Sequence, residues 1–219
     1  MKRFLDRREA GKELAQLLLK FKEQPDGIVL ALPRGGVPVG YEVTLALNVP
    51  LDVFVVRKLG LPGQEELAIG AIASGGIRIL NETIIHALKI DQTVIDRVTQ
   101  EETQELKRRE IQYRGNRPPP ELENRTIILI DDGLATGASM LAAVHALRRQ
   151  RPKKIIIAVP AAAPQAINLL RPEADEIVFV IAPDPFEGVG KWYEDFAQTT
   201  DDEVRSLLDD AKRRLVHNR

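Results

Sequence analysis

The chain has 219 residues, of which 44% are hydrophobic and 29% are charged, and its formal net charge is −1. A chain of this length can bury one large core, and its near-zero charge gives no general attraction to nucleic acid or to an anionic membrane. The absence of cysteine excludes disulfides and thiolate metal sites, and the charged start and short apolar stretches predict neither a secretion signal nor a membrane span, so we expect a cytoplasmic protein.

The first elements of the chain alternate between helical and extended patterns. Asp6 and Glu9 form a capping box that opens a helix. A short apolar strand is predicted at residues 28–32, and Pro33-Arg34-Gly35-Gly36 follows it before a second helix. Paired glycines let backbone amides approach an anion closely, and Arg34 adds a fixed charge. The loop is a candidate anion site, although an ordinary turn between a strand and a helix would also explain it.

The following stretch interrupts this alternation. Residues 51–56 predict a strand, and a loop containing the adjacent cations Arg57 and Lys58 is expected at 57–63. Alternating residues on either side of Ser74-Gly75-Gly76 predict a hairpin, and a long polar helix is expected at residues 91–113. We interpret residues 59–120 as an inserted lid or small subdomain within a single domain of residues 1–219. Arg57 and Lys58 could bind an anion, or they could be the ordinary solvated charges at the end of a strand.

The turn after the predicted strand at 126–130 is the most informative feature of the chain. Asp131 and Asp132 end this strand, and a helix start follows at Ala135, Thr136, Gly137, Ala138 and Ser139. Gly137 allows a turn in which these amides converge on one phosphate, and the missing lysine excludes the phosphate loop of nucleotide triphosphatases. Two carboxylates beside a phosphate suit sugar hydroxyls or a metal. The predicted ligand is a phosphorylated sugar, and the alternative is a structural turn with capping acids.

The C-terminal part supplies two more strands, at residues 154–159 and 176–181, and then an aromatic segment at 182–200. Strands separated by helices predict a doubly wound α/β fold with a mostly parallel sheet. Ligands in such folds bind at the carboxyl ends of the strands. We therefore expect the loops at 33–36, 57–63 and 131–139 to share one edge of the sheet.

The apolar strand, the two acids and Thr136-Gly137-Ala138-Ser139 resemble the signature of type I phosphoribosyltransferases, which bind phosphoribosyl pyrophosphate (PRPP). The resemblance implies a parallel sheet with a smaller α+β lid and hood. It implies an enzyme of nucleotide metabolism that transfers the 5-phosphoribosyl group between PRPP and a nitrogenous base and releases diphosphate with Mg²⁺. It also implies a homodimer.

The resemblance assigns roles to the candidate residues. The residues from Ala135 to Ser139 would hold the 5-phosphate, and Asp131 and Asp132 would orient the ribose hydroxyls. Mg²⁺ would be held through PRPP, with help from these acids and without a separate protein metal site. The diphosphate would bind a loop with a strained or cis peptide and the cations after the next strand. These contacts are Arg34, Gly35, Gly36, Arg57 and Lys58, of which Arg34 and Lys58 would act in catalysis.

The acceptor base is less well defined. The hood at 182–200 would place Phe186, Trp192 and Tyr193 near the base, although aromatic residues near a terminus also fit a core. Ala135 stands where enzymes for hypoxanthine and guanine usually carry an aspartate, which disfavours a 6-oxopurine. The alternative function is a PRPP- or nucleotide-binding regulatory protein with weak catalysis.

Overall fold

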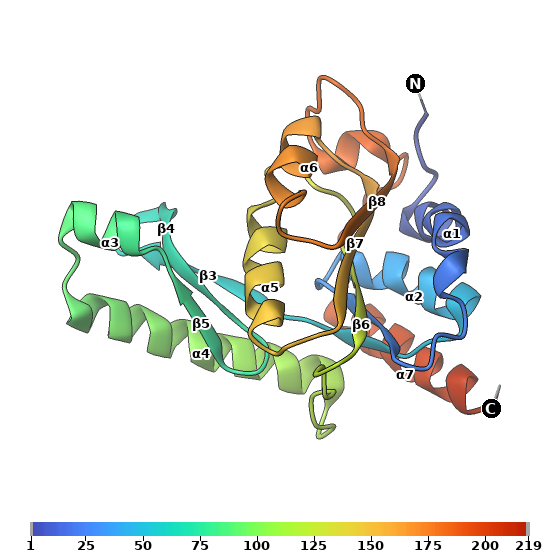
Figure 1. Cartoon of the computed structure of the whole chain (residues 1–219), viewed down its shortest axis with the longest axis horizontal. Coiled ribbons are helices and arrows are strands. Elements are labelled where there is room, and N and C mark those ends of the chain that lie inside the picture. Colours follow the sequence, from blue (N-terminus) through green and yellow to red (C-terminus); the bar gives the residue numbers. More distant parts are fainter. Residues whose placement is uncertain (1, 218–219) are drawn as a thin grey trace.

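The computed structural model describes residues 2–217 and contains two sheets with helices around them (Figure 1). All strands of the main sheet run parallel, in the order β2-β1-β6-β7-β8. These strands are β1 (Gly27–Ala31), β2 (Leu51–Val53), β6 (Thr126–Ile130), β7 (Lys154–Ala161) and β8 (Glu176–Ile181). The doubly wound α/β fold predicted from the sequence is confirmed, with β6 and β8 at their predicted bounds.

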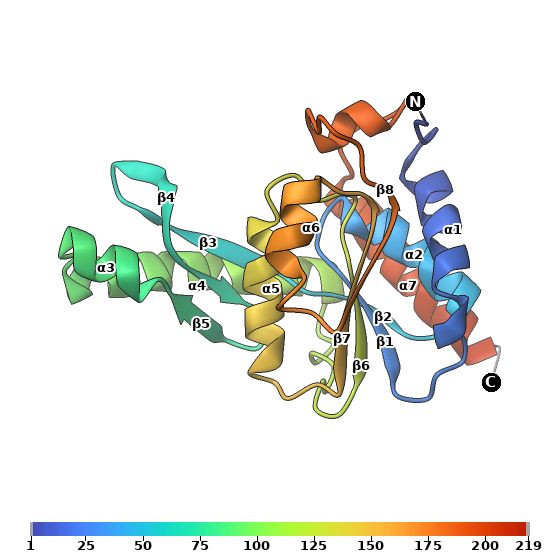
Figure 2. The same cartoon turned by 45° about the horizontal axis from the view of Figure 1, so that its top comes forward.

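Helices cover both faces of the main sheet (Figure 2). One face carries α1 (Arg7–Leu17) and α2 (Gly36–Leu47), and the other carries α5 (Ala138–Arg148) and α6 (Pro164–Leu170). Neighbouring residues of a strand point to opposite faces, so Ile128 packs on the α1 side and Leu129 on the α5 side. The central strands β1, β6 and β7 are therefore buried on both faces, which explains their long apolar runs.

Residues 56–114 form a second body, here called the arm, which extends to one side of the main sheet (Figure 1). Its antiparallel sheet has the order β3-β4-β5, and helices α3 and α4 follow. The bounds are β3 (Val56–Leu61), β4 (Gln64–Ala73), β5 (Ile77–Leu80), α3 (Glu82–Leu88) and α4 (Gln92–Arg114). The predicted hairpin and long helix are confirmed. The predicted loop at 57–63 is wrong, because residues 56–61 pair with β4.

The N-terminal segment and the C-terminal helix pack against different parts of the fold. Phe4 pairs with Tyr193 in an isolated bridge, which joins the N-terminus to the segment after β8. Short 3-10 turns lie at η1 (Leu19–Phe21) and η2 (Val189–Trp192), and α7 (Asp201–His217) packs against α2 and α4. Among residues 2–217, no helix has the length and apolar character needed to span a membrane.

Candidate active site

The acidic turn lies at the carboxyl end of β6 and leads directly into α5. Gly137 caps this helix in a left-handed conformation with φ of 79°, which explains the need for glycine. The Leu141 N–H makes a 2.8 Å bond back to the Gly137 carbonyl, so the amides before Leu141 form the unpaired N-terminal set of the helix. Within the part of the chain that the structure describes, the only hydrogen bond to one of them is a long one of 3.4 Å, from the Ala138 N–H to the Thr136 hydroxyl. The turn can therefore present several amides to an anion.

Asp132 is held by an arginine from the start of α1. Arg7 Nε donates to Asp132 Oδ2 at 2.8 Å, and the two side chains are 12% and 14% exposed. The Arg7 guanidinium also donates to the Ala197 carbonyl at 2.7 Å and lies 3.9 Å from the centre of the Phe196 ring. The Tyr193 hydroxyl donates to the Asp132 carbonyl at 2.6 Å. The second acid is therefore fixed by both its side chain and its backbone.

Burial changes the protonation of the acid pair. It raises the pKa of Asp131 well above its ordinary value, and the charge of neighbouring Asp132 raises it further. Burial also raises the pKa of Asp132, while the Arg7 charge works in the opposite direction. Two adjacent half-buried carboxyls with one arginine partner are short of positive charge. The site is thus suited to a ligand that donates hydroxyl protons or brings a cation.

The loop after β1 lies against this acid pair. A Cβ atom at Gly35 would stand 2.0 Å from Asp132 Oδ2, and one at Gly36 would stand 2.8 Å from the Ile130 carbonyl oxygen. Because glycine has no Cβ atom, the backbone of this loop can lie against the acidic turn, and any other residue at these two positions would clash with it. The peptide bond between Pro33 and Arg34 is cis, as the resemblance implies. Arg34 NH1 lies 3.7 Å from Asp201 Oδ1 at the start of α7.

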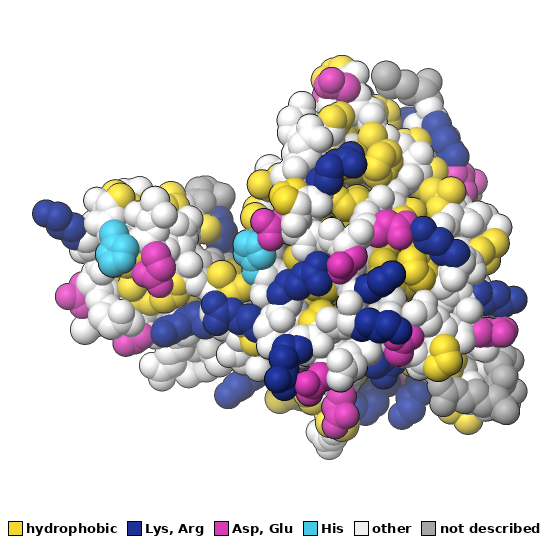
Figure 3. All heavy atoms as spheres, viewed as in Figure 1, with side chains coloured by type: hydrophobic (Ala, Val, Ile, Leu, Met, Phe, Trp, Pro, Cys, Tyr) yellow, Lys and Arg dark blue, Asp and Glu magenta, His cyan; other side chains and the backbone are white. Residues whose placement is uncertain are grey.

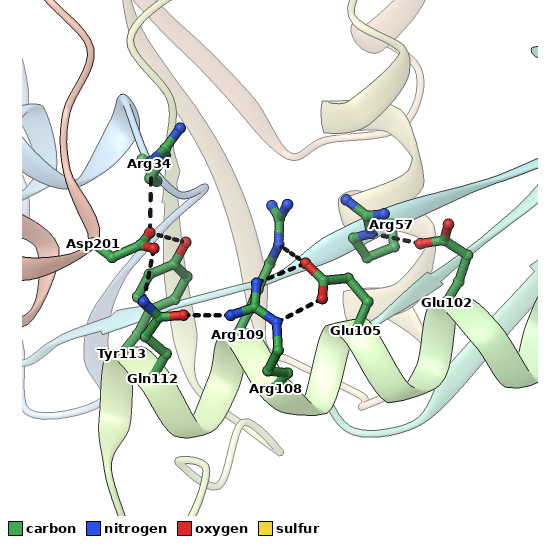
Figure 4. A network of polar contacts seen from close by, with 9 residues as sticks. All are labelled: Arg34, Arg57, Glu102, Glu105, Arg108, Arg109, Gln112, Tyr113 and Asp201. Carbon is green, nitrogen blue, oxygen red and sulfur yellow. Dashed lines mark hydrogen bonds and ion pairs between the residues drawn. The ribbon is translucent and has the colours of Figure 1, made fainter.

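The two cations of β3 lie on opposite faces of the arm sheet, since consecutive strand residues alternate. Arg57 faces α4, where its Nε donates to Glu102 at 2.6 Å (Figure 4). Lys58 is exposed and lines a cleft of about 580 Å³ together with Ser139. This cleft separates the arm sheet from α5, and the space-filling outline is indented between the arm and the body (Figure 3). Lys58, and not Arg57, therefore shares a surface with the predicted phosphate cradle.

The predicted hood aromatics are mostly covered by protein. Trp192 and Tyr193 are 4% and 1% exposed and belong to a core cluster with Phe4, while Phe186 is half-buried against it. Phe196 is 37% exposed, but Arg7 lies over its ring. In this conformation the rings of Trp192 and Tyr193 offer no open face to a base. Base binding by Phe186, Trp192 and Tyr193 stays a prediction.

Sequence reasoning missed the protein partners of the candidate residues. Arg7 is 125 residues from Asp132 in the chain, and Asp201 lies far beyond Arg34. Neither residue belongs to a local motif, so only the fold could place them. Among the side chains that the structure describes, which leave out those of residues 66 and 217, no group of three or more histidine or acidic residues is arranged to hold a metal. Any cation at the acid pair would need ligand oxygens as well.

Comparisons with known proteins agree with this geometry. Residues 3–183 match the phosphoribosyl transferase domain. This chain belongs to the phosphoribosyl transferase family. A family member from Mycobacterium tuberculosis, provisionally named a phosphoribosyl transferase, is 43% identical over 213 residues, which are 97% of this chain and 48% of that protein. The chain therefore spans about half the length of that relative.

Two further comparisons place the chain within the family. The crystal structure of TT1426 from Thermus thermophilus has a TM-score of 0.82 and 40% identity, covering 94% of this chain and 97% of that chain. A uracil phosphoribosyltransferase from Lactobacillus gasseri is 38% identical over 69 residues, which are 32% of each protein. The family assignment covers the main sheet and the arm, and the match to the uracil enzyme covers only a part of this chain.

Proposed function

We propose that this protein transfers the 5-phosphoribosyl group of PRPP to a nitrogenous base and releases diphosphate. The observation that carries the proposal is the half-buried pair Asp131 and Asp132, closely followed by the unpaired amides at the start of α5. A phosphorylated ribose matches both halves of this arrangement, because the amides suit its phosphate and the acids suit its hydroxyls. Membership of the phosphoribosyl transferase family supports the same ligand.

Each residue then has a distinct role. The amides from Ala135 to Ser139 hold the 5-phosphate, and Asp131 and Asp132 orient the ribose hydroxyls. Positive charge develops at the anomeric carbon as diphosphate leaves, and the carboxylates stabilise it. Arg34 stabilises the departing diphosphate, and we propose the same role for Lys58. The protein acts mainly by positioning and by charge, because the bond changes occur within the substrates.

The donor set at the acid pair fits Mg²⁺. Carboxylate and hydroxyl oxygens are its preferred ligands, and it is commonly bound by one or two carboxylates together with substrate phosphates. Asp131 and the free oxygen of Asp132 are the residues that would hold it. The raised pKa of Asp131 reflects a need for positive charge that such a cation would meet. When bound, Mg²⁺ supplies charge neutralisation to the diphosphate.

The acceptor base is proposed only as a class. The short match to a uracil phosphoribosyltransferase makes uracil the first base to test. The experiment measures diphosphate release from Mg-PRPP across a panel of purine and pyrimidine bases, with Asp131→Asn/Asp132→Asn protein as the control. Release with one base that is lost in the control identifies the substrate. If PRPP binds but no base of the panel causes diphosphate release, the protein does not transfer the phosphoribosyl group efficiently to any of these bases.

A second candidate is a PRPP- or nucleotide-binding regulatory protein with weak catalysis. The observation that favours it is that two proposed catalytic groups already have protein partners. Asp132 is paired with Arg7 at 2.8 Å, and Arg34 lies 3.7 Å from Asp201. These partners offset the charges of Asp132 and Arg34, which leaves less charge to stabilise a transition state, whereas the amides at the start of α5 can still bind a phosphate. Saturable PRPP binding with no measurable diphosphate release from any base favours this function.

A further inference from the structure

Three guanidinium groups from separate elements lie along one side of α4 (Figure 4). Arg34 comes from the loop after β1, Arg57 from β3, and Arg109 from α4 itself. Their side chains are 33%, 27% and 34% exposed, so each is accessible to solvent without being fully solvated. Two of them were expected near diphosphate from the sequence, but Arg109 was not. The structure adds this third cation to the same region.

Each arginine is held through one side and leaves donors available. Arg57 Nε donates to Glu102 at 2.6 Å, and Arg109 Nε donates to Glu105 at 2.8 Å. Within the described part of the chain, the terminal nitrogens of Arg57 and Arg109 have no acceptor. In Figure 4 the terminal nitrogens of Arg109 point away from α4, between Arg34 and Arg57. The carboxylates thus fix the orientation of the guanidiniums and leave the forked ends for another partner.

The phenol of Tyr113 lies close enough to Arg34 and Arg109 for both charges to act on its pKa. Burial and a hydrogen bond to Asp201 raise its pKa, whereas the charges of Arg109 and Arg34 both work to lower it. A residue of α4 and a residue of the loop after β1 therefore act on one hydroxyl group. The Tyr113 hydroxyl donates to Asp201 at 3.0 Å, and Asp201 is also the partner of Arg34. These contacts connect Arg109 to the loop assigned to the leaving group.

We propose that Arg109 is a further diphosphate-binding residue, which completes an anion site with Arg34 and Arg57. The inference rests on the proposed function. Each guanidinium has one carboxylate partner that fixes its orientation, and a diphosphate has enough oxygens to accept from the remaining donors of all three. Lys58 lies on the opposite face of β3, so the contact with diphosphate proposed for it above would come from the cleft and not from this group. The arm therefore contributes to the site through α4 as well as through β3.

The test uses isothermal titration of the full chain with Mg-diphosphate and with Mg-PRPP. Arg109→Gln is expected to weaken both affinities by about tenfold to hundredfold, the range for a lost hydrogen bond to a charged group. Arg108→Gln is the matched control, because Arg108 also bonds Glu105 but turns its donors toward Glu105 and Gln112. Its affinities are expected to stay within about twofold of wild type. Arg109→Lys should recover part of the loss, because it keeps the charge without the forked donors.

The outcomes separate this inference from the proposed function. Equal affinities for Arg109→Gln and Arg108→Gln, in proteins that melt at the same temperature, would overturn the role of Arg109 alone. Absence of any PRPP or diphosphate binding by wild-type protein would overturn the proposed function and the inference together. If Arg109→Gln protein is unstable, Arg109→Lys decides the question. Wild-type affinity in folded Arg109→Lys protein would show that the forked donors of Arg109 do not bind the diphosphate, and would overturn the inference.

Discussion

Asp131 and Asp132 differ in their surroundings although they are neighbours in the chain. Arg7 donates to one oxygen of Asp132, whereas Asp131 accepts from the backbone N–H of Asp132 at 2.8 Å. Asp132 is therefore the acid with a compensating charge, and its pKa is raised less strongly than that of Asp131. A carboxylate that is already oriented before the ligand binds stabilises developing charge without reorganisation.

The first prediction concerns turnover. Asp132→Asn is expected to lower kcat by about a hundredfold, which corresponds to about 3 kcal/mol of transition-state energy, because a neutral amide cannot stabilise the positive anomeric carbon. The measurement is diphosphate release from Mg-PRPP with the accepted base. Asp202→Asn, at an exposed position of α7, is the control and should leave turnover unchanged. Unchanged turnover in Asp132→Asn would remove this acid from the mechanism.

The second prediction concerns stability and pH. The folded pKa of Asp131 lies above its unfolded value, so the stabilisation linked to this group is complete below about pH 4 and is lost as pH rises through the folded pKa. Asp131→Asn carries no charge at any pH. At pH 8 it should therefore exceed wild type by about 1 kcal/mol in the free energy of unfolding, or roughly 2–4 °C in Tm.

The measurement is Tm of both proteins between pH 4 and pH 8 without ligand. The difference should grow with pH and approach zero at pH 4. Asp202→Asn should show no such trend, because its carboxylate is almost fully exposed. A wild-type protein that becomes more stable than Asp131→Asn as pH rises would show that the fold favours the ionised carboxylate.

At the scale of elements, the sequence predicted those strands that are marked by a continuous run of apolar residues. The apolar run of β6 lies between Arg125 and Asp131, that of β8 follows Asp175 and ends shortly before Pro183, and the predicted limits of both match the structure. The strand β3 was expected to be a loop because Gly60, Pro62 and Gly63 are typical of turns. It forms because residues 56–61 pair with β4, with register shifts around Gly60. This pairing depends on residues further along the chain, so local pattern cannot show it.

A buried arginine links the arm to the edge strand of the main sheet. Arg114, at the end of α4, is 5% exposed and bonds Asp52 Oδ1 at 2.7 Å and the Val53 carbonyl at 2.6 Å. It also pairs with Glu110 at 2.9 Å. These contacts join α4 to β2, the edge strand of the main sheet. Because the carboxylates of Asp52 and Glu110 are only about one-fifth exposed, they depend on this partner.

The third prediction follows from this attachment. Arg114→Met keeps much of the buried volume but leaves two carboxylates and a carbonyl without their donor. It should lower the free energy of unfolding by about 3 kcal/mol. Urea denaturation measures the change, and Lys107→Met, at an exposed position of α4, is the control with little expected effect. Equal stability of the two variants would mean that apolar contacts alone hold α4 against β2.

At the scale of the whole molecule, the site is assembled from segments that are far apart in the chain. The acid pair and the glycine loop could be predicted, because each is a compact motif at the end of a strand. The positions of Arg7, Asp201 and Arg109 could not be predicted. These residues lie in helices with many charged residues, and no sequence motif distinguishes them from the others. Only the packing of α1, α7 and α4 around the carboxyl edge of the sheet selects these three.

The arm and the body enclose the cleft that a closing lid would narrow. Lys58 on the arm and Ser139 on α5 both line it, so a ligand at the phosphate cradle lies beside a wall formed by the arm sheet. Transfer from PRPP requires that water be kept from the anomeric carbon, and closing segments commonly provide this protection. The hairpin of β3 and β4 is joined through Pro62 and Gly63, away from the main sheet (Figure 2).

The last prediction is that Mg-PRPP slows amide hydrogen exchange within residues 59–76 by several-fold. The physical reason is that a closed arm spends less time in the open states from which amides exchange. Peptides from the second half of α7 serve as the internal control and should not change. Asp131→Asn/Asp132→Asn protein should lose the effect, because it lacks the acids that we propose orient the ribose. Unchanged exchange in 59–76 at saturating PRPP would show that the arm is a fixed wall and that another segment, such as residues 182–200, must shield the reaction.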